Sequence, residues 1–452
     1  MKRCHLPLML TLLILASAGC PKPEEDKGPV GPPPGTNLRV IVVGDPLLAQ
    51  SIGYLQSEWK AQSGVGLDIK DVATDQFDPR KAPEADMVVA PSWMLGSADS
   101  AGWVLPLPER VAQNNESDWS DIFLQIRSHE VAVPFGSPVP VLYSRPDLFK
   151  ESGRKTPRTW AEYVEAVEAG TSTAEPLKEG WAGLTLLAQS AAYASHPNNL
   201  STLFRINTME PLIAGPPFVR ALEELVATAD VASLDMDPNA VRAAFWQGKV
   251  GMAITWPTAA DEELADIEPD FPVGVTELPG SPDVYDLGET TWEKRDKDSD
   301  GRVPLLAASG RVGMVTTSSQ WPDASQQLLL WLTDKKWSAQ VCSQSLNTTL
   351  FRDSHVGLAS GWVESPMSND AAQQYGEAIA TALERRQRLL ALVIPGRPEY
   401  LATLDEAVRA AVKKEKSPQE ALDGAAKQWK AITEELGVDK QKGAYRASLG
   451  LK

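Results

Sequence analysis

The sequence predicts a two-lobed α/β protein with mainly parallel sheets. The first observation is an alternation of apolar strands and amphipathic helices between Leu38 and Ala90, which is typical of parallel α/β units. The second is a proline-interrupted apolar stretch from Val131 to Tyr143, which is followed by a clear helix start at Thr159. The third is length, because the 452-residue chain is long enough to bury two sizeable cores even without its N-terminal leader.

The expected elements of the first lobe alternate in type. They are a strand at Leu38–Val43, a helix with the apolar stripe Leu48, Ile52, Leu55 and Trp59 that ends at Gly64, and strands at Leu67–Val72 and Met87–Ala90. Sheets of this kind bind ligands beyond the carboxyl ends of their strands. Asp45 and Trp93 follow two of these ends, so both are candidate ligand contacts.

Three prolines interrupt the stretch from Val131 to Tyr143, at Pro134, Pro138 and Pro140. Proline donates no backbone hydrogen bond and fixes φ, so we expect this stretch to be an extended connection rather than a central strand. It is interpreted as a hinge between two bodies.

Helices and strands alternate again beyond the hinge. We expect a helix with a capping box at Thr159 and Glu162 that ends at Gly170, a helix at Pro217–Ala229, a helix from Asp237-Pro238 to Gly248, and strands at Val250–Thr255 and Phe271–Leu278. A polar insertion at Ser281–Pro304, an apolar return at Val312–Val315, a helix at Asp323–Thr333 and a C-terminal helix capped by Ser417 and Glu420 follow.

The N-terminus reads as an export leader. Basic residues precede an apolar run from Leu6 to Ala18, which is shorter than the ~20 residues that span a bilayer, so residues 1–20 are expected to be a cleaved signal. Small residues directly before Cys20 resemble the bacterial lipoprotein signal, in which that cysteine becomes the lipidated first residue; an ordinary secretory signal is the alternative. Residues 21–36, rich in proline and poor in apolar side chains, are expected to be a flexible tether.

Charge and cysteine content restrict the partners. The formal net charge of −17 argues against nucleic acid and anionic bilayers, which would repel the protein. Of the three cysteines, Cys4 leaves with the signal and Cys20 would be acylated, so Cys342 alone remains and no internal disulfide is expected.

Two motifs resemble the extracellular solute-binding proteins of ABC importers, in the sugar-binding branch that includes maltose-binding proteins. The first comprises Pro134, Leu142, Tyr143, Asp147, Leu148, Phe149, Gly153, Pro157, Thr159, Trp160, Glu162 and Tyr163, and the second comprises Phe245, Gly248, Lys249, Met252, Ile254, Trp256 and Pro257. The sequence departs from the first motif at Ser144, Arg145 and Pro146.

This resemblance implies a type II periplasmic-binding-protein-like fold, in which several hinge crossovers join the lobes. The implied N-terminal lobe comprises residues 37–135 and 306–346, and the implied C-terminal lobe comprises residues 136–305 and 347–452.

A sugar site needs aromatic faces for the C–H side of a pyranose and planar polar groups for its hydroxyls. The aromatic candidates are Trp93, Trp256, Trp292 and Trp362, out of 14 tryptophans; each of them could instead pack in a core. The polar candidates are Asp45 and the turn Ser309, Gly310 and Arg311, although Asp45 could instead cap the helix that follows it. Phe135 and Ser137 are hinge candidates whose alternative is linker packing.

A weak structural Ca²⁺ site is the one metal candidate, and no other cofactor is expected. Asp296, Asp298 and Asp300, followed by Gly301, match the front of a calcium loop, but its twelfth position is Ala307 rather than glutamate. A solvated acidic loop is the alternative interpretation.

Catalysis finds little support, because the three histidines beyond the leader lack zinc spacings and no nucleophile motif is present. We therefore expect a non-enzymatic, lipid-anchored, exported receptor. It would be a monomer that captures a mono- or oligosaccharide and presents it to an ABC transporter permease. The alternatives are the same fold with a polyamine, metal complex or peptide as ligand, a surface glycosidase, and a sensor or scaffold.

Overall fold

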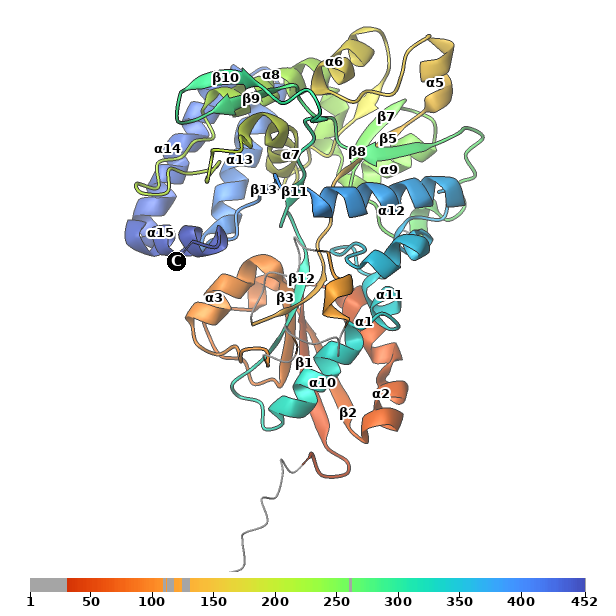
Figure 1. Ribbon diagram of the computed structural model, residues 1–452, viewed down its shortest axis with the longest axis vertical. Helices are drawn as coiled ribbons and strands as arrows, with labels where there is room; N and C mark the ends of the chain where they lie inside the picture. Colours follow the sequence, from red (N-terminus) through yellow and green to blue (C-terminus); the bar gives the residue numbers. More distant parts are fainter. Residues whose placement is uncertain (1–30, 109–110, 112–117, 124–130, 260–261, 452) are drawn as a thin grey trace, which may run out of the picture.

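The computed structural model describes residues 31–108, 111, 118–123, 131–259 and 262–451. The expected signal, Cys20 and the tether up to residue 30 lie outside the described residues. Figure 1 shows two bodies, which we call the first lobe (below) and the second lobe (above), with the connecting segments between them. Among the described residues, no helix combines the length and apolar character needed to cross a membrane.

The first lobe is built on a five-stranded sheet with the order β2-β1-β3-β12-β4. Its strands are β1 (Asn37–Val43), β2 (Gly66–Val72), β3 (Met87–Pro91), β4 (Val133–Gly136) and β12 (Arg311–Val315). β1 pairs in parallel with β2 and β3, whereas β12 is antiparallel to both β3 and β4. The expectation of mainly parallel sheets is therefore wrong in detail. β12 begins at the hinge, so it has to run opposite to β1 and β3, which end there.

Helices cover the first sheet. They are α1 (Pro46–Tyr54), α2 (Gln56–Ser63), α3 (Leu95–Ser100), α10 (Pro322–Leu332) and α11 (Ser338–Cys342), together with the short 3₁₀ segments η1 (Thr74–Gln76), η2 (Ser92–Met94) and η4 (Trp119–Asp121). The single helix expected after Asp45 is interrupted at Leu55 between α1 and α2. Gly64 ends α2 at φ 76°, a backbone conformation that glycine adopts without strain.

The second lobe carries a four-stranded sheet with the order β6-β7-β5-β8. Its strands are β5 (Val141–Ser144), β6 (Thr173–Ala174), β7 (Met252–Thr255) and β8 (Gly274–Glu277). β5 lies between β7 and β8 and is antiparallel to both.

The central position of β5 corrects the expectation that Val131–Tyr143 holds no central strand. Pro138 and Pro140 precede β5 rather than lie within it, so every residue of the strand keeps its N–H group. Pro134 does lie within a strand, β4, which is at the edge of the first sheet.

The second lobe is rich in helices. They are α5 (Pro146–Glu151), α6 (Trp160–Glu168), α7 (Ala182–Ala194), α8 (Pro216–Thr228), α9 (Pro238–Trp246), α12 (Asn369–Glu384), α13 (Arg397–Val412), α14 (Pro418–Leu436) and α15 (Val438–Ser448). The capping boxes expected at Thr159 and Ser417 are confirmed, with each cap side chain bonded to the glutamate three residues on and the reverse bond also made. The 3₁₀ segments are η5 (Val231–Asp235), η6 (Glu262–Leu264) and η7 (Asp353–Trp362).

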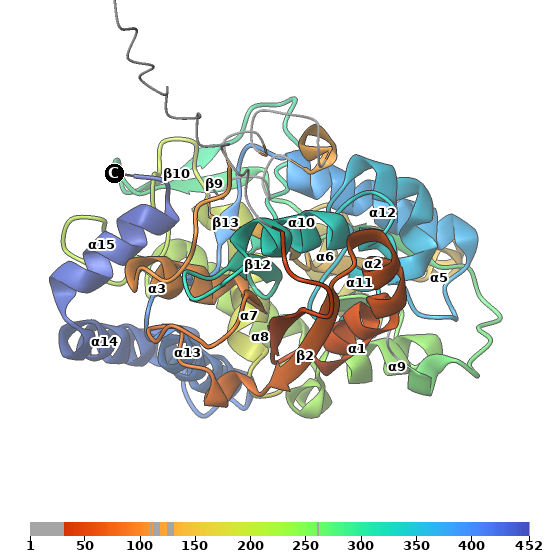
Figure 2. The same ribbon diagram turned by 90° about the horizontal axis from the view of Figure 1, so that it is seen from below.

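The polar insertion folds into a hairpin, β9 (Asp283–Asp286) and β10 (Thr291–Lys294), at the far end of the second lobe. A two-stranded parallel pair, β11 (Leu305–Leu306) and β13 (Leu389–Leu390), lies next to the hinge. α15 packs against α3 of the first lobe, and Figures 1 and 2 both show these helices on the same side of the molecule.

The apolar core is not divided cleanly between the lobes. One cluster runs from Val40 and Val42 of β1 to Tyr143 of β5 and Trp246 of α9. A second cluster belongs to the second lobe, and a third covers the other face of the first sheet. The first cluster therefore includes residues of both lobes.

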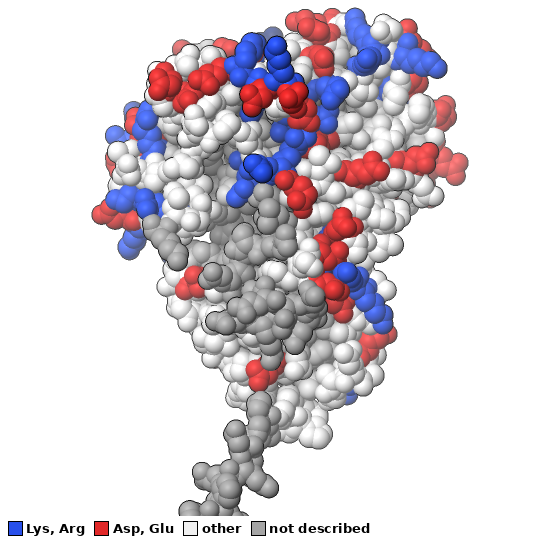
Figure 3. All heavy atoms as spheres, in the orientation of Figure 1, with Lys and Arg blue, Asp and Glu red and all other residues white. Residues whose placement is uncertain are grey.

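The surface bears charges of both signs. On the face seen in Figure 3, Lys and Arg side chains lie among Asp and Glu side chains on the second lobe. Cys342 is a buried free thiol, and burial raises its pKa.

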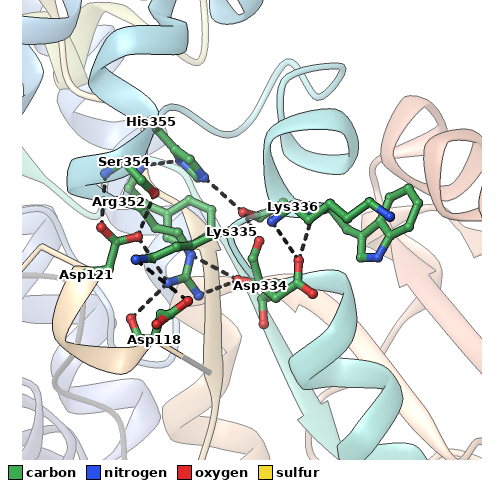
Figure 4. A network of polar contacts seen from close by, with 12 residues as sticks. Asp118, Asp121, Asp334, Lys335, Lys336, Arg352, Ser354 and His355 are labelled. Atoms are coloured by element: carbon green, nitrogen blue, oxygen red, sulfur yellow. Dashed lines mark hydrogen bonds and ion pairs between the residues drawn. The ribbon is translucent and has the colours of Figure 1, made fainter. Parts of the chain in front are cut away.

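A polar network anchors the segment that leads from α11 into η7 (Figure 4). The guanidinium of Arg352 donates to the carbonyls of Thr333 and Asp118, and Ser354 donates from its backbone N–H (3.0 Å) and its hydroxyl (2.6 Å) to Asp121. His355 accepts from the N–H of Phe351 at Nδ1, so its Nε2–H donates to Ser338 at 2.9 Å. The ring is fully buried, and burial, with the nearby Arg352, lowers its pKa from 6.5 to about 3.

His355 should make stability depend on pH. Between pH 6.5 and 3 the unfolded chain binds a proton at His355 that the folded protein does not, so stability is complete above pH 6.5 and falls by about 1.4 kcal/mol per unit as the pH decreases. Urea denaturation at pH 7, 6 and 5 should give a steeper loss of unfolding free energy for the wild type than for His355→Gln. Identical pH dependence of the two proteins would contradict this assignment.

Candidate functional site

The strand register places two candidate residues at one edge of the first sheet. β1 and β3 run in parallel, and both end beside Gly136 and Arg311, which pair with each other where β4 ends and β12 begins. Asp45 follows β1, and Trp93 lies in η2 directly after β3. Both residues therefore lie at the edge of the first sheet that adjoins the hinge.

The second sheet presents a matching edge. Val141, the first residue of β5 after the hinge, pairs with Thr255, the last residue of β7. Trp256 follows at once, so it lies at the end of the second sheet closest to the first lobe. Its side chain is 5% exposed.

Trp181 is a site residue that the sequence reasoning missed. It is the N-cap residue of α7, and its ring lies 5.1 Å from that of Trp256, tilted by 53°. Trp181 is only half-buried, so it offers the more accessible face of the pair. The available signal was its setting between Gly180 and Gly183 at a helix start, where a large side chain has no stripe to join.

Asp45 and Arg311 form a buried pair at the first edge. Asp45 Oδ2 lies 3.2 Å from Arg311 Nε and accepts from the Ser345 hydroxyl at 2.5 Å and from Asn347 Nδ2 at 3.2 Å. Its Oδ1 accepts from the Leu48 N–H at 3.1 Å, so the cap interpretation of Asp45 is confirmed. The two side chains are 2% and 5% exposed, which leaves them little surface for a ligand.

The two Nη groups of Arg311 donate to backbone carbonyls. Nη2 donates to the carbonyl of Gly44 at 2.8 Å and Nη1 to that of Gly310 at 3.1 Å. Burial lowers the pKa of Arg311, and Asp45 opposes this shift. The pair thereby ties the end of β1 to the segment at Gly310 and to the segment at Ser345.

The three segments that connect the lobes, at Gly136, Gly310 and Thr349, approach one another closely at the two glycines. Gly136 has φ 112°, and a Cβ there would lie 2.4 Å from the carbonyl oxygen of Thr349. Gly310 has φ 135°, and a Cβ there would lie 3.1 Å from the carbonyl oxygen of Gly136. The hydroxyl of Ser137 donates to the carbonyl of Ser309 at 3.0 Å. No larger side chain fits at either glycine without moving the adjacent segment.

Several buried donors at these edges have no hydrogen-bond partner among the described residues. They are Ser92 Oγ, Trp256 Nε1 and Arg397 Nε, of which the last belongs to the first residue of α13. Buried polar groups are normally paired, and similar unpaired atoms, such as Trp59 Nε1 and Trp160 Nε1, also occur in the cores. The three named here lie at the facing edges, where a bound polar molecule would supply partners.

Other candidate residues lie elsewhere. Trp292 lies on β10 and packs against Tyr193. Tyr193 and Trp181 lie at opposite ends of α7, about 18 Å apart at 1.5 Å per residue. Trp362 is 2% exposed and packs on His355, with its ring centroid 4.7 Å away. Phe135 is fully buried in the core. The side chains of these three residues do not line the facing edges.

The expected calcium ligands do not converge in the structure. Both oxygens of Asp300 accept from Arg385, at 2.9 and 2.7 Å, and Asp296 and Asp298 do not join it in a ligand cluster. Within the described ranges, the cluster with metal-like spacing is His196, Asp286 and Glu293, beside the β9–β10 hairpin. His196 accepts there from the Asn198 N–H at Nδ1 and lies 3.1 Å from Glu293 through Nε2, so its ring is already satisfied by protein.

A hollow of about 890 Å³ also opens between the lobes, away from the tryptophans. Its wall includes Ser120–Phe123 from the first lobe and Ala380, Thr381, Glu384 and Arg385 from the second. Two of the charged groups in this wall are engaged by side chains outside it: Asp121 accepts from the Ser354 hydroxyl, and Arg385 donates to Glu277. We therefore place the candidate site at the tryptophan edges, which offer ring faces and unpaired donors.

Comparisons with known proteins agree with this architecture. The family described as "Bacterial extracellular solute-binding protein" matches residues 52–339. No curated protein matches the sequence.

Solved structures with the same fold include an ABC transporter solute-binding protein from Agrobacterium radiobacter K84 in complex with ribitol. It is 20% identical, with a TM-score of 0.62 over 88% of this chain and 99% of that one. The sugar-binding protein MalE of Xanthomonas citri is 17% identical, with a TM-score of 0.64 over 89% and 98% of the two chains. Maltose-bound MalE3 of T. maritima is 16% identical, with a TM-score of 0.61 over 88% and 100%. At these identities the likeness establishes the fold alone.

Removing the buried carboxylate should destabilise the protein strongly. Asp45→Ala leaves Arg311 buried without a counter-charge, so the free energy of unfolding should fall by about 3–5 kcal/mol in chemical denaturation. Asp78→Ala is the matched control, because its partner Arg80 is 79% exposed and such pairs contribute about 1 kcal/mol or less. A loss at Asp45 no larger than the loss at Asp78 would contradict the proposed role of the buried pair.

Proposed function

Because the chain belongs to the bacterial extracellular solute-binding proteins, we propose that it captures a small carbohydrate between its two lobes and delivers it to the permease of an ABC transporter. The observation that carries this proposal is the pair Trp181 and Trp256 on one lobe, opposite Trp93 on the other. Fold relatives in complex with ribitol, maltose or mannitol support the same ligand class.

The chemistry of these edges suits a sugar. The two faces of a pyranose differ: the C–H groups on one pack against aromatic rings, and the hydroxyls seek planar donors and acceptors. Trp181 supplies an accessible ring, and Ser92 Oγ and Trp256 Nε1 are donors without protein partners. A ligand that met both lobes would satisfy groups from each of them at once.

Capture by closure follows from this geometry. Contacts from both lobes exist together only when the edges approach, so a ligand that makes both sets of contacts favours the closed arrangement. The three segments that touch at Gly136 and Gly310 are the places where such a movement would pivot. The closed form would be the one presented to the permease.

Placement at the membrane is a further part of the proposal. The leader at residues 1–20 would direct export, lipidation at Cys20 would anchor the chain, and residues 21–36 would hold the folded body away from the bilayer as a monomer. The family assignment supports an extracytoplasmic location, and the sequence around Cys20 supports the anchor.

The tryptophan pair gives a direct test of the site. Trp181→Ala should weaken binding of the best saccharide by about tenfold, since it removes a stacking face together with apolar contact area. Trp256→Ala should weaken binding at least as much. Isothermal titration calorimetry with a panel of mono- and oligosaccharides measures the affinity.

Trp292→Ala is the matched control. This tryptophan packs on Tyr193 at the other end of α7, so its removal should leave the affinity unchanged. A panel without any saccharide binder, together with a clear polyamine or peptide binder, would overturn the carbohydrate assignment. Equal losses in all three variants would remove the site.

A further inference from the structure

Arg397 lies where the first lobe, the second lobe and a connecting segment meet. It is the first residue of α13, and its guanidinium carbon lies 5.6 Å from the centre of the Trp93 ring. Its Nη2 donates to the carbonyl of Ala308, in the segment that leads to Gly310. The side chain is 9% exposed, so the charge is buried next to the candidate site.

Arg397 lacks the counter-charge that the comparable arginines have. Three other arginines are equally buried in the described part of the chain, and each has a carboxylate at ion-pair distance: Arg242 with Glu364 at 3.5 Å, Arg311 with Asp45 at 3.2 Å, and Arg352 with Asp121 at 3.5 Å. No described carboxylate lies within 4.0 Å of Arg397.

The guanidinium of Arg397 is also short of hydrogen bonds. It carries five N–H donors, and its Nε has no partner among the described residues. Burial lowers its pKa to about 10, without an opposing effect from a nearby carboxylate. A buried charge in this condition is unfavourable until an anion joins it.

The helix that begins at Arg397 adds to the positive potential. α13 has 16 residues, and its N-cap is Gly396, which has no side chain. In the first turn the Arg397 N–H donates to the carbonyl of Ile394 and Pro398 has no N–H, so within the described ranges the Glu399 N–H is the one left free, next to its own acidic side chain. The positive end of the helix dipole therefore coincides with an unpaired guanidinium. The helix contributes little more than its dipole, so the guanidinium is the main group that would attract an anion here.

We propose that the saccharide bound between the lobes carries an anionic group, a carboxylate or a phosphate, which Arg397 binds next to Trp93. This inference rests on the proposed function and names the substrate class of the same site. A planar guanidinium offers two parallel N–H groups to either anion, and the ring of Trp93 holds it in place. A polyamine, which is cationic, would be repelled at this position.

The overall charge of −17 does not oppose the assignment. Screening limits the reach of exposed surface charges to about 8 Å at physiological ionic strength, whereas a buried guanidinium acts on its ligand with little screening. The acidic surface would lower the rate of association more than the final affinity.

Matched sugars test the charge of the ligand. Calorimetry on the purified full chain would compare glucose with glucuronate and glucose 6-phosphate, and galactose with galacturonate. One acidic member should bind roughly tenfold to hundredfold more tightly than its neutral partner, as expected for hydrogen bonds to a charged group. The comparison of the uronates with glucose 6-phosphate shows whether the bound anion is a carboxylate or a phosphate.

Variants test whether Arg397 causes the preference for acidic over neutral sugars. In Arg397→Met the ratio of acidic to neutral affinity should fall to about one, and Arg397→Lys should keep part of it through its charge alone. Arg386→Gln, at an exposed arginine of the same formal charge, should keep the full ratio.

Stability gives a readout that is independent of the ligand. Arg397→Met removes an unpaired buried charge, so its melting temperature should equal or exceed that of the wild type, whereas Arg311→Met, which breaks a pair, should lower it. Tight binding by neutral sugars alone, or a marked loss of stability in Arg397→Met, would overturn the anion assignment and leave the proposed function standing. Failure of every sugar to bind would contradict the proposed function, and this inference with it.

Discussion

The buried contact between Asp45 and Arg311 fixes the geometry on which the rest of the structure depends. It joins the end of β1 and the start of α1 to two of the segments that connect the lobes, at Gly310 and at Ser345. Two charges withdrawn from water are tolerated here because the other oxygens and N–H groups of the pair are largely bonded as well. Any change in one connecting segment is therefore transmitted to the edge of the first sheet.

The position of the site follows from that constraint. β1 and β3 end at the hinge, and β7 ends beside the first residue of β5, so the residues after these strands face one another from two lobes. Trp93 and Trp256 occupy such positions, Trp181 reaches Trp256 from the start of α7, and Arg397 lies beside Trp93 at the start of α13. The apolar cluster that spans both lobes, in which Tyr143 and Trp246 pack, supports the connecting segments. A rigid apolar support combined with an edge that carries unpaired donors is suited to closure on a ligand.

The sequence was sufficient for the elements whose local signals agree with their surroundings. The capping boxes at Thr159 and Ser417, the strand ends at Asp45 and Trp93 and the two-lobed class all follow from periodicity, cap residues and motif resemblance. The sequence was insufficient to predict the direction of a strand and its position in a sheet, because both depend on its pairing partners. The direction of β12 and the central position of β5 depend on strands far away in the chain. Trp181 and Trp292 lie near opposite ends of α7, and the sequence does not show which end adjoins the first lobe. The missing counter-charge of Arg397 can be recognised only when all of its neighbours are known.

The two tryptophan edges should approach each other around a bound ligand. Double electron–electron resonance between spin labels at Ser100 on α3 and Glu179 before α7, both exposed, would measure the separation of the lobes with and without the best-binding saccharide. The account predicts that saturating ligand shifts the distance distribution to a single shorter and narrower population. An unchanged distribution, at a ligand concentration where calorimetry shows full occupancy, would contradict it.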